Sequence, residues 1–140
     1  MRGTPGVLCL LLLTLGPARV VADDLTGADE LLCSMSTALA CDPLGECYSI
    51  SPWELNVPQF VVVDLEDKML RTTAASGENR ETPIKNLERA RGEIYLQGVQ
   101  AGRAFSAVII EATGELSIGV AMSGLGVVVF GACTPQPSDD

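Results

Sequence analysis

Four runs of β-prone residues follow one another between residues 93 and 133. Val, Ile, Tyr and Phe are frequent in these runs, and a short turn that contains glycine separates each run from the next. Short runs of this composition joined by tight turns are typical of an antiparallel meander. The sequence therefore predicts four consecutive antiparallel strands. They are expected at residues 93–99, 103–111, 115–121 and 126–133.

Alternation within these runs predicts which side chains face the core. Successive residues of a strand point to opposite faces, so every second residue shares a face. Residues 127–130 are apolar at every position, which predicts a strand that is covered on both faces or lies at a barrel seam. The side chains expected to face inward are Ile94, Leu96, Phe105, Ala107, Ile109, Leu116, Ile118, Val120 and Met122.

Shorter elements precede the meander. Residues 26–29 carry a capping pattern that predicts one helical turn, and the polar residues 74–81 predict an exposed loop. Apolar and β-branched residues in the segments between turn residues indicate further short strands. These strands are expected at residues 34–40, 48–50, 59–65, 68–73 and 82–89.

The clearest helix start lies at Ser51. This serine cap is followed by Pro52 at the first helical position and by Glu54 three residues after the cap. Pro58 ends the helix, because the residue before a proline avoids the helical region. One short helix is therefore expected near residues 52–57.

Eight or nine short antiparallel strands and one short helix predict a single all-β domain. A meander leaves two sheet edges, and a closed or nearly closed barrel removes them. A two-sheet sandwich is the alternative, because strand spacing does not separate the two architectures. The domain is expected to span residues 23–133. Residues 134–140 contain two prolines and two terminal aspartates and are expected to form a disordered C-terminal tail.

Residues 1–22 have the pattern of a secretory signal peptide. Arg2 precedes a nearly continuous apolar run at residues 7–15, and Val21 and Ala22 supply the small residues of a cleavage site. The run is far shorter than the roughly 20 residues that a membrane-spanning helix needs. Cleavage after Ala22 is expected, with no stable membrane insertion afterwards. The mature protein is then periplasmic if the source is a Gram-negative bacterium, and extracellular otherwise.

The chain is acidic, which limits its partners. It carries nine basic and eighteen acidic residues and no histidine. Loss of Arg2 and Arg19 with the signal peptide leaves seven basic residues and a net charge of −11. Such a surface repels phosphate groups, so nucleic acid is not expected as a partner.

Four cysteines remain after the signal peptide, and in an exported chain they predict two disulfides. Cys41 and Cys47 flank a turn that contains Asp-Pro and Gly, which favours a bond between them. Cys33 and Cys133 would then join the first strand to the last. The alternative pairs Cys33 with Cys41 and Cys47 with Cys133. A metal site is not expected, because the chain has no Cys-x-x-Cys pair and no histidine.

Candidate chemical groups are few. The lack of histidine excludes Ser-His and Cys-His catalysis, and no catalytic residue or cofactor is expected. Asp64, Glu66 and Asp67 lie at a predicted hairpin turn, where a solvated carboxylate cluster is favoured over a Ca²⁺ site. Four arginines lie at predicted loop or strand ends, where they either balance surface charge or converge on an anion. They are Arg80, Arg89, Arg91 and Arg103.

Short motifs are spread along the mature chain, many of them at turns or strand ends. They lie at residues 41–47, 51–52, 58–60, 64–65, 96–98, 102–107, 112–114 and 129–134. Together with the signal peptide, these motifs resemble a family of small exported bacterial proteins of proteobacterial type, whose function is uncharacterised. The resemblance covers most of the mature chain and implies export and a common β fold. It implies no activity and no site residue.

Three functions are compatible with these observations and are given in order of preference. The first is a non-catalytic exported binding or inhibitor-like module, whose disulfide-bonded β scaffold presents loops to an unidentified protein or envelope component. The second is a carrier of a small apolar ligand inside a barrel, where Gly98, Ala107 and Gly119 would leave room. The third is a carboxylate-dependent hydrolase, which needs two carboxylates facing each other in a cleft. No enzymatic activity is expected.

The predicted cleavage site gives the first testable outcome. Mass spectrometry of the exported protein should find Asp23 at its N-terminus, because the small residue at position 22 suits the signal peptidase. Cell-associated protein that still begins at Met1 would contradict the prediction.

Overall fold

The computed structural model describes residues 24–136, and its fold is all-β. Within this range no helix is both long and apolar enough to span a membrane. Two short 3₁₀ turns interrupt the strands, η1 (Pro52–Leu55) and η2 (Ala74–Ser76). The strands are β1 (Glu30–Cys41), β2 (Cys47–Ile50), β3 (Phe60–Asp64), β4 (Met69–Thr72), β5 (Glu81–Pro83), β6 (Asn86–Ala90), β7 (Glu93–Gln100), β8 (Arg103–Ile110), β9 (Glu115–Met122) and β10 (Leu125–Pro135).

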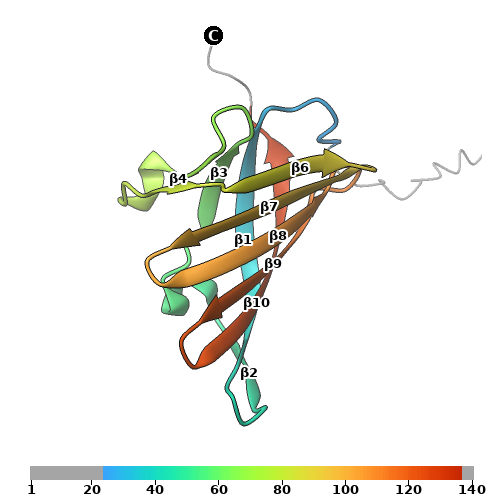
Figure 1. The fold of residues 1–140 in the computed structure, drawn as a ribbon. Helices are drawn as coiled ribbons and strands as arrows, with labels where there is room; N and C mark the ends of the chain where they lie inside the picture. The colour runs from blue at the N-terminus through green and yellow to red at the C-terminus, as the bar shows by residue number, and fades with distance from the viewer. Residues whose placement is uncertain (1–23, 137–140) are drawn as a thin grey trace, which may run out of the picture.

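One sheet holds all the strands of the described residues and curls into a half-barrel (Figure 1). The strand order is β5-β4-β3-β1-β10-β9-β8-β7-β6, and β2 pairs only with β1, as a hairpin that extends from the sheet. Each neighbouring pair is antiparallel. The predicted meander is therefore confirmed, and the fold is one sheet curled into a half-barrel rather than a two-sheet sandwich.

One short segment of the chain connects the two edge strands of the sheet. β5 and β6 lie at opposite ends of the strand order, yet only Ile84 and Lys85 separate them in the chain. The N–H of Ile84 donates to the carbonyl of Lys68 at 2.9 Å, and the N–H of Lys85 donates to the carbonyl of Gln97 at 2.8 Å. The same short segment thus continues the pairing of β5 beside β4 and begins the pairing of β6 with β7.

The hydrophobic core fills the inner side of the curled sheet. Most of the side chains that the alternation places inward are buried or packed against the core. A β-bulge between Met35 and Thr37 shifts the register of β1 by one residue, so Ala38 and Ala40 also face inward beyond it. β1 therefore contributes to the core along its whole length. The core includes Leu31, Cys33, Ile94, Leu96, Ala107, Ile109, Leu116, Val127 and Val129.

The start of the first strand differs from the prediction. β1 begins at Glu30 rather than at residue 34, because Leu31 and Leu32 pair with β3 on one side and with β10 on the other. Residues 26–29, for which one helical turn was expected, form a non-helical turn. The sheet therefore begins three residues before the first cysteine of β1, Cys33, and no helical turn precedes it within residues 24–29.

β10 continues past the predicted end of the domain. Thr134 and Pro135 pair with β1, and the N–H of Gln136 donates to a β1 carbonyl at 2.9 Å. The boundary at residue 133 is therefore wrong, and the first three residues of the tail predicted at 134–140 bond to the sheet. The last four residues of the chain and the predicted signal peptide lie outside the described residues.

Two predicted strands also need correction. The segment 82–89 is not one strand but two, because the chain crosses there from one sheet edge to the other. Residues 127–130 are not covered on both faces. Val128 and Phe130 are 42% and 44% exposed on the outer face of the sheet.

η1 takes the place of the short helix predicted near residues 52–57. Its start follows the predicted pattern, since the carboxylate of Glu54 accepts a hydrogen bond from the N–H of Ser51 at 3.0 Å. Asn56 ends it after one turn, with a φ of 55° in the left-handed region. A single 3₁₀ turn therefore replaces the predicted helix.

Two disulfides join the cysteines in the predicted pairs. Cys33 and Cys133 lie directly opposite each other on β1 and β10, and both are buried. Cys41 and Cys47 close the β1–β2 hairpin. Gly114 lets the β8–β9 turn pack against the first of these bonds, because a Cβ at position 114 would lie 2.2 Å from the carbonyl oxygen of Cys133. The first and last strands are thus linked covalently in a tightly packed region.

Replacing Cys33 and Cys133 together by Ala should lower the free energy of unfolding more than replacing Cys41 and Cys47. The two bonds span 100 and 6 residues, and release of the longer loop returns more entropy to the unfolded chain. The entropy model gives about 4–5 kcal/mol for the long loop and about 2 kcal/mol for the short one. Urea denaturation of the two double variants measures the difference. Equal losses, or a larger loss at the hairpin bond, would contradict this ranking.

Candidate binding site

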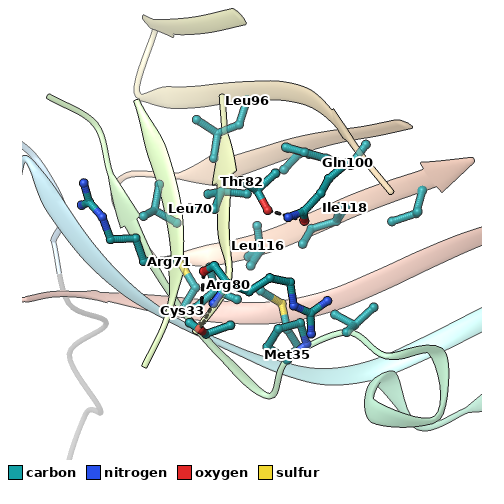
Figure 2. A pocket seen from close by; sticks show the side chains of 18 of the residues that line it. Cys33, Met35, Leu70, Arg71, Arg80, Thr82, Leu96, Gln100, Leu116 and Ile118 are labelled. Carbon is teal, nitrogen blue, oxygen red and sulfur yellow. Dashed lines mark hydrogen bonds between the residues drawn. The ribbon is translucent and has the colours of Figure 1, made fainter. Parts of the chain in front are cut away.

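A small cavity lies inside the half-barrel and is lined by residues of β1, β3, β4 and β5 and of β7, β8 and β9. Its volume is about 140 Å³. Figure 2 shows Leu70, Leu96 and Ile118, from three different strands, around the same space. Most of the lining is apolar. The apolar side chains are Met35, Val57, Val61, Val63, Leu70, Leu96, Phe105, Ala107, Ile109, Leu116, Ile118 and Val120.

Small residues were expected to leave room in the interior, and one of the three does so. Ala107 lines the cavity. Gly98 lies opposite Phe105, and a Cβ at position 98 would come within 2.5 Å of the Phe105 ring, so this glycine makes room for the ring. Gly119 is exposed on the outer face and contributes nothing to the interior. The cavity therefore depends on Ala107 more than on either glycine.

Two arginines meet where η1 ends. Arg103, the first residue of β8, donates from Nη1 to the carbonyl of Leu55 at 2.8 Å. Arg80 donates from Nη1 to the carbonyl of the next residue, Asn56, at 3.1 Å. Both arginines also line the cavity. The sequence thus places two guanidinium groups beside an otherwise apolar space.

The arginines that line the cavity differ in how their charges are balanced. Arg71 binds three carboxylates, and Arg80 binds that of Glu78. Arg103 is half-buried and has no carboxylate within salt-bridge distance among residues 24–136. Its positive charge is therefore the one that the cavity wall leaves unbalanced. The partners of Arg71 are Asp64, Asp67 and Glu81.

Thr82 on the edge strand β5 bonds to Gln100 on β7, the neighbour of the other edge strand (Figure 2). The hydroxyl of Thr82 donates to the side-chain oxygen of Gln100, and Thr82 itself is buried. The side-chain nitrogen of Gln100 donates to the carbonyl of Glu81 at 3.0 Å. Both polar ends of the Gln100 amide are thus engaged within the protein, so this pair holds β5 against β7.

The four arginines singled out from the sequence separate into two groups. Arg80 and Arg103 converge at η1. Arg89 binds Glu111 instead, and Arg91 is exposed in the turn between β6 and β7. Arg91 therefore lies where a surface charge is expected, whereas Arg80 and Arg103 converge on two backbone carbonyls. Their convergence on an anion stays a prediction.

The predicted carboxylate cluster belongs to an ion-pair network. Asp64 and Asp67 bind Arg71, and Glu66 is exposed in the turn. In the part of the chain that the structure describes, no group of three or more acidic or cysteine residues is placed to hold a metal ion. No carboxylate of residues 24–136 lines the cavity, so the facing pair that a glycoside hydrolase needs is not found there.

The outer face of β8, β9 and β10 forms a second notable surface. Apart from Glu115 at one end, the outward side chains of these strands are small or apolar and carry no charge. Leu39, opposite Val128 on the neighbouring β1, is 42% exposed and extends this face. The outward residues are Ala104, Ser106, Val108, Ser117, Gly119, Ala121, Gly126, Val128 and Phe130.

Comparison of the chain with family models, with curated proteins and with solved structures found no match. The resemblance to small exported bacterial proteins therefore stays a prediction. No relative therefore indicates a function, and the apolar cavity inside the half-barrel is the candidate binding site of residues 24–136.

Asp64 and Arg71 form a partly buried ion pair between β3 and β4. Burial alone would raise the pKa of the Asp64 carboxyl, but the N–H of Asp67 and the guanidinium of Arg71 lower it below its ordinary value. Asp64, followed by Asp67, raises the pKa of Arg71 in turn. A carboxyl whose pKa is lowered by folding stabilises the folded state above its unfolded pKa. That contribution disappears as the pH falls through the folded-state pKa.

Asp64→Asn should therefore destabilise the protein near neutral pH, by on the order of 1 kcal/mol. The difference from the wild type should narrow as the pH falls below about 4, where the carboxyl first takes up a proton in the unfolded state. It should be lost once the pH has also passed the lowered folded-state pKa. Urea denaturation across this pH range measures the difference. Glu46→Gln removes an exposed carboxylate and should leave stability nearly unchanged throughout. A difference for Asp64→Asn that does not vary with pH would show that its charge is not the cause.

Proposed function

We propose that this protein is a non-catalytic binding module that acts outside the cytoplasm and holds a small, largely apolar ligand inside its half-barrel. The observation that carries the proposal is the apolar cavity of about 140 Å³ inside the half-barrel, which is partly open to solvent. Ligand sites in proteins are typically concave and lined mostly by hydrophobic side chains with a few polar groups. A ligand that enters such a space gains dispersion contacts with its lining.

The size of the cavity limits the size of its ligand. A cavity of roughly 150 Å³ lined by aliphatic and aromatic side chains admits one benzene molecule. Drug-sized ligands need pockets of about 300–1,000 Å³. The ligand of this cavity is therefore a single ring or a short branched chain.

The scaffold around the cavity is suited to binding without large rearrangement. A disulfide links β1 to β10, and the segment between β5 and β6 joins the remaining edges. A site that is rigid before binding loses little conformational entropy when a ligand enters. Two disulfides also fit an oxidising compartment, which supports export to the periplasm or the cell exterior.

The outer face supports a second candidate function, binding of a protein or envelope component. Leu39, Val128 and Phe130 are exposed on a face that is nearly free of charge, in a chain with a net charge of −9. Contiguous exposed apolar surface commonly occurs at protein interaction sites. This candidate places the partner on the opposite side of the sheet from the cavity, so variants on the two faces separate the two functions.

Ala107→Ile should abolish binding of a small apolar probe such as toluene, because the larger side chain fills the cavity. Ala104→Ile is the matched control: it makes the same change on the same strand, but on the outer face. Toluene at about 100 times its Kd should stabilise the wild type and the control by roughly 2.7 kcal/mol, and should not stabilise Ala107→Ile. Thermal unfolding with and without toluene gives the comparison.

If Ala107→Ile is too crowded to fold, Ala107→Val makes the same test with a smaller change. Toluene that stabilises neither the wild type nor the control would contradict the proposal. Equal stabilisation of the wild type and the filled variant would also contradict it. Loss of binding only in Ala104→Ile would favour the outer face.

A further inference from the structure

The unbalanced charge of Arg103 is informative because the rest of the chain is strongly acidic. Eighteen acidic residues are available, yet none within residues 24–136 is in salt-bridge distance of this guanidinium. A guanidinium group has five N–H donors, and the one hydrogen bond that Arg103 makes uses Nη1, to the carbonyl of Leu55. The other four donors have no protein partner among residues 24–136 and are open to a ligand.

The neighbouring arginine adds to this positive charge. Arg80 and Arg103 bond to the successive carbonyls of Asn56 and Leu55, and both line the cavity. In the described part of the chain, Glu78 is the one carboxylate paired with either of them. Two guanidinium groups with one carboxylate leave a net positive charge at this end of the cavity.

We propose that the ligand of the cavity is a small monocarboxylate, with its carboxylate bound to Arg103 and its apolar body inside the half-barrel. This inference rests on the proposed function, since it names the ligand class of the same cavity. Arginine matches a carboxylate with two parallel N–H···O bonds, which are stronger than bonds between neutral groups. A bound carboxylate also balances a half-buried charge that would otherwise be left without a partner.

The shape of the site restricts which carboxylates fit. Away from the arginines most of the lining is apolar, and the polar side chains Thr72, Thr82 and Gln100 already hydrogen-bond within the protein. A second charged group on the far end of the ligand would therefore be buried without a partner. The volume of about 140 Å³ limits the body to one ring or a short branched chain. Benzoate satisfies both conditions, toluene has the same body without the charge, and terephthalate carries a second carboxylate at the opposite end.

The test measures the Kd of benzoate, toluene and terephthalate for the wild type and for three variants. In Arg103→Gln the charge is lost, in Arg103→Lys the charge is kept without the planar fork, and in Arg91→Gln an exposed charge is removed elsewhere. Benzoate should bind the wild type more tightly than toluene or terephthalate. Arg103→Gln should weaken benzoate by roughly 10- to 100-fold and leave toluene unchanged. Arg103→Lys should weaken benzoate by a smaller factor, and Arg91→Gln should change neither ligand.

The outcomes separate the inference from the proposed function. If neither toluene nor benzoate binds the wild type, the proposed function itself is wrong. Two results would show that the cavity takes an apolar ligand and that the carboxylate inference is wrong. The first is that toluene binds the wild type and benzoate binds it no more tightly. The second is that Arg103→Gln leaves the benzoate Kd unchanged. Unchanged toluene binding in Arg103→Gln shows that the cavity is intact. If that variant does not fold, the ratio of benzoate to toluene affinity in Arg103→Lys decides: a lowered ratio supports the inference and an unchanged ratio overturns it.

Discussion

The pairing of β1 with β10 is the interaction on which the rest of the structure depends. It joins the two ends of the described domain along the full length of β1, and the buried disulfide between Cys33 and Cys133 lies within it. Each of these contacts closes a loop of about a hundred residues, which is entropically costly to form. Once formed, the contacts bring the meander and the N-terminal strands into one curved sheet whose inner faces oppose each other. The cavity exists because those faces are held apart by the curvature and incompletely filled.

The fold was largely predictable because its signals are local. Alternation in residues 93–122 gave the strands and their inward faces, and the turn between Cys41 and Cys47 gave the hairpin disulfide. The wrong strand boundaries lie where the neighbouring strand, and not the local sequence, determines whether a residue forms strand. Residues 134–135 form strand because β1 lies beside them. Strand β5 ends and β6 begins because the chain passes there from one edge of the sheet to the other. Neither the partner nor the edge is visible in a single sequence.

The site was less predictable than the fold. The absence of histidine and the small size of Ala107 were useful, because they excluded familiar chemistry and pointed to interior space. Convergence was only one alternative for four arginines, and the sequence did not single out Arg80 and Arg103. The turn that both bind is 24 residues from the first, at Asn56, and 48 residues from the second, at Leu55. An arginine in an acidic chain is expected to pair with a carboxylate. Only the three-dimensional structure shows that Arg103, at the cavity, pairs with none among residues 24–136.

The claim that the ligand binds inside the half-barrel is tested most directly by NMR distance contacts between a bound probe and assigned methyl groups. Toluene is a suitable probe because its binding does not depend on the charge of Arg103. The geometry predicts intermolecular NOEs from its ring to methyl groups of Leu116 and Ile118, which line the cavity. NOEs confined to Leu39 and Val128, on the exposed outer face, would contradict an interior site.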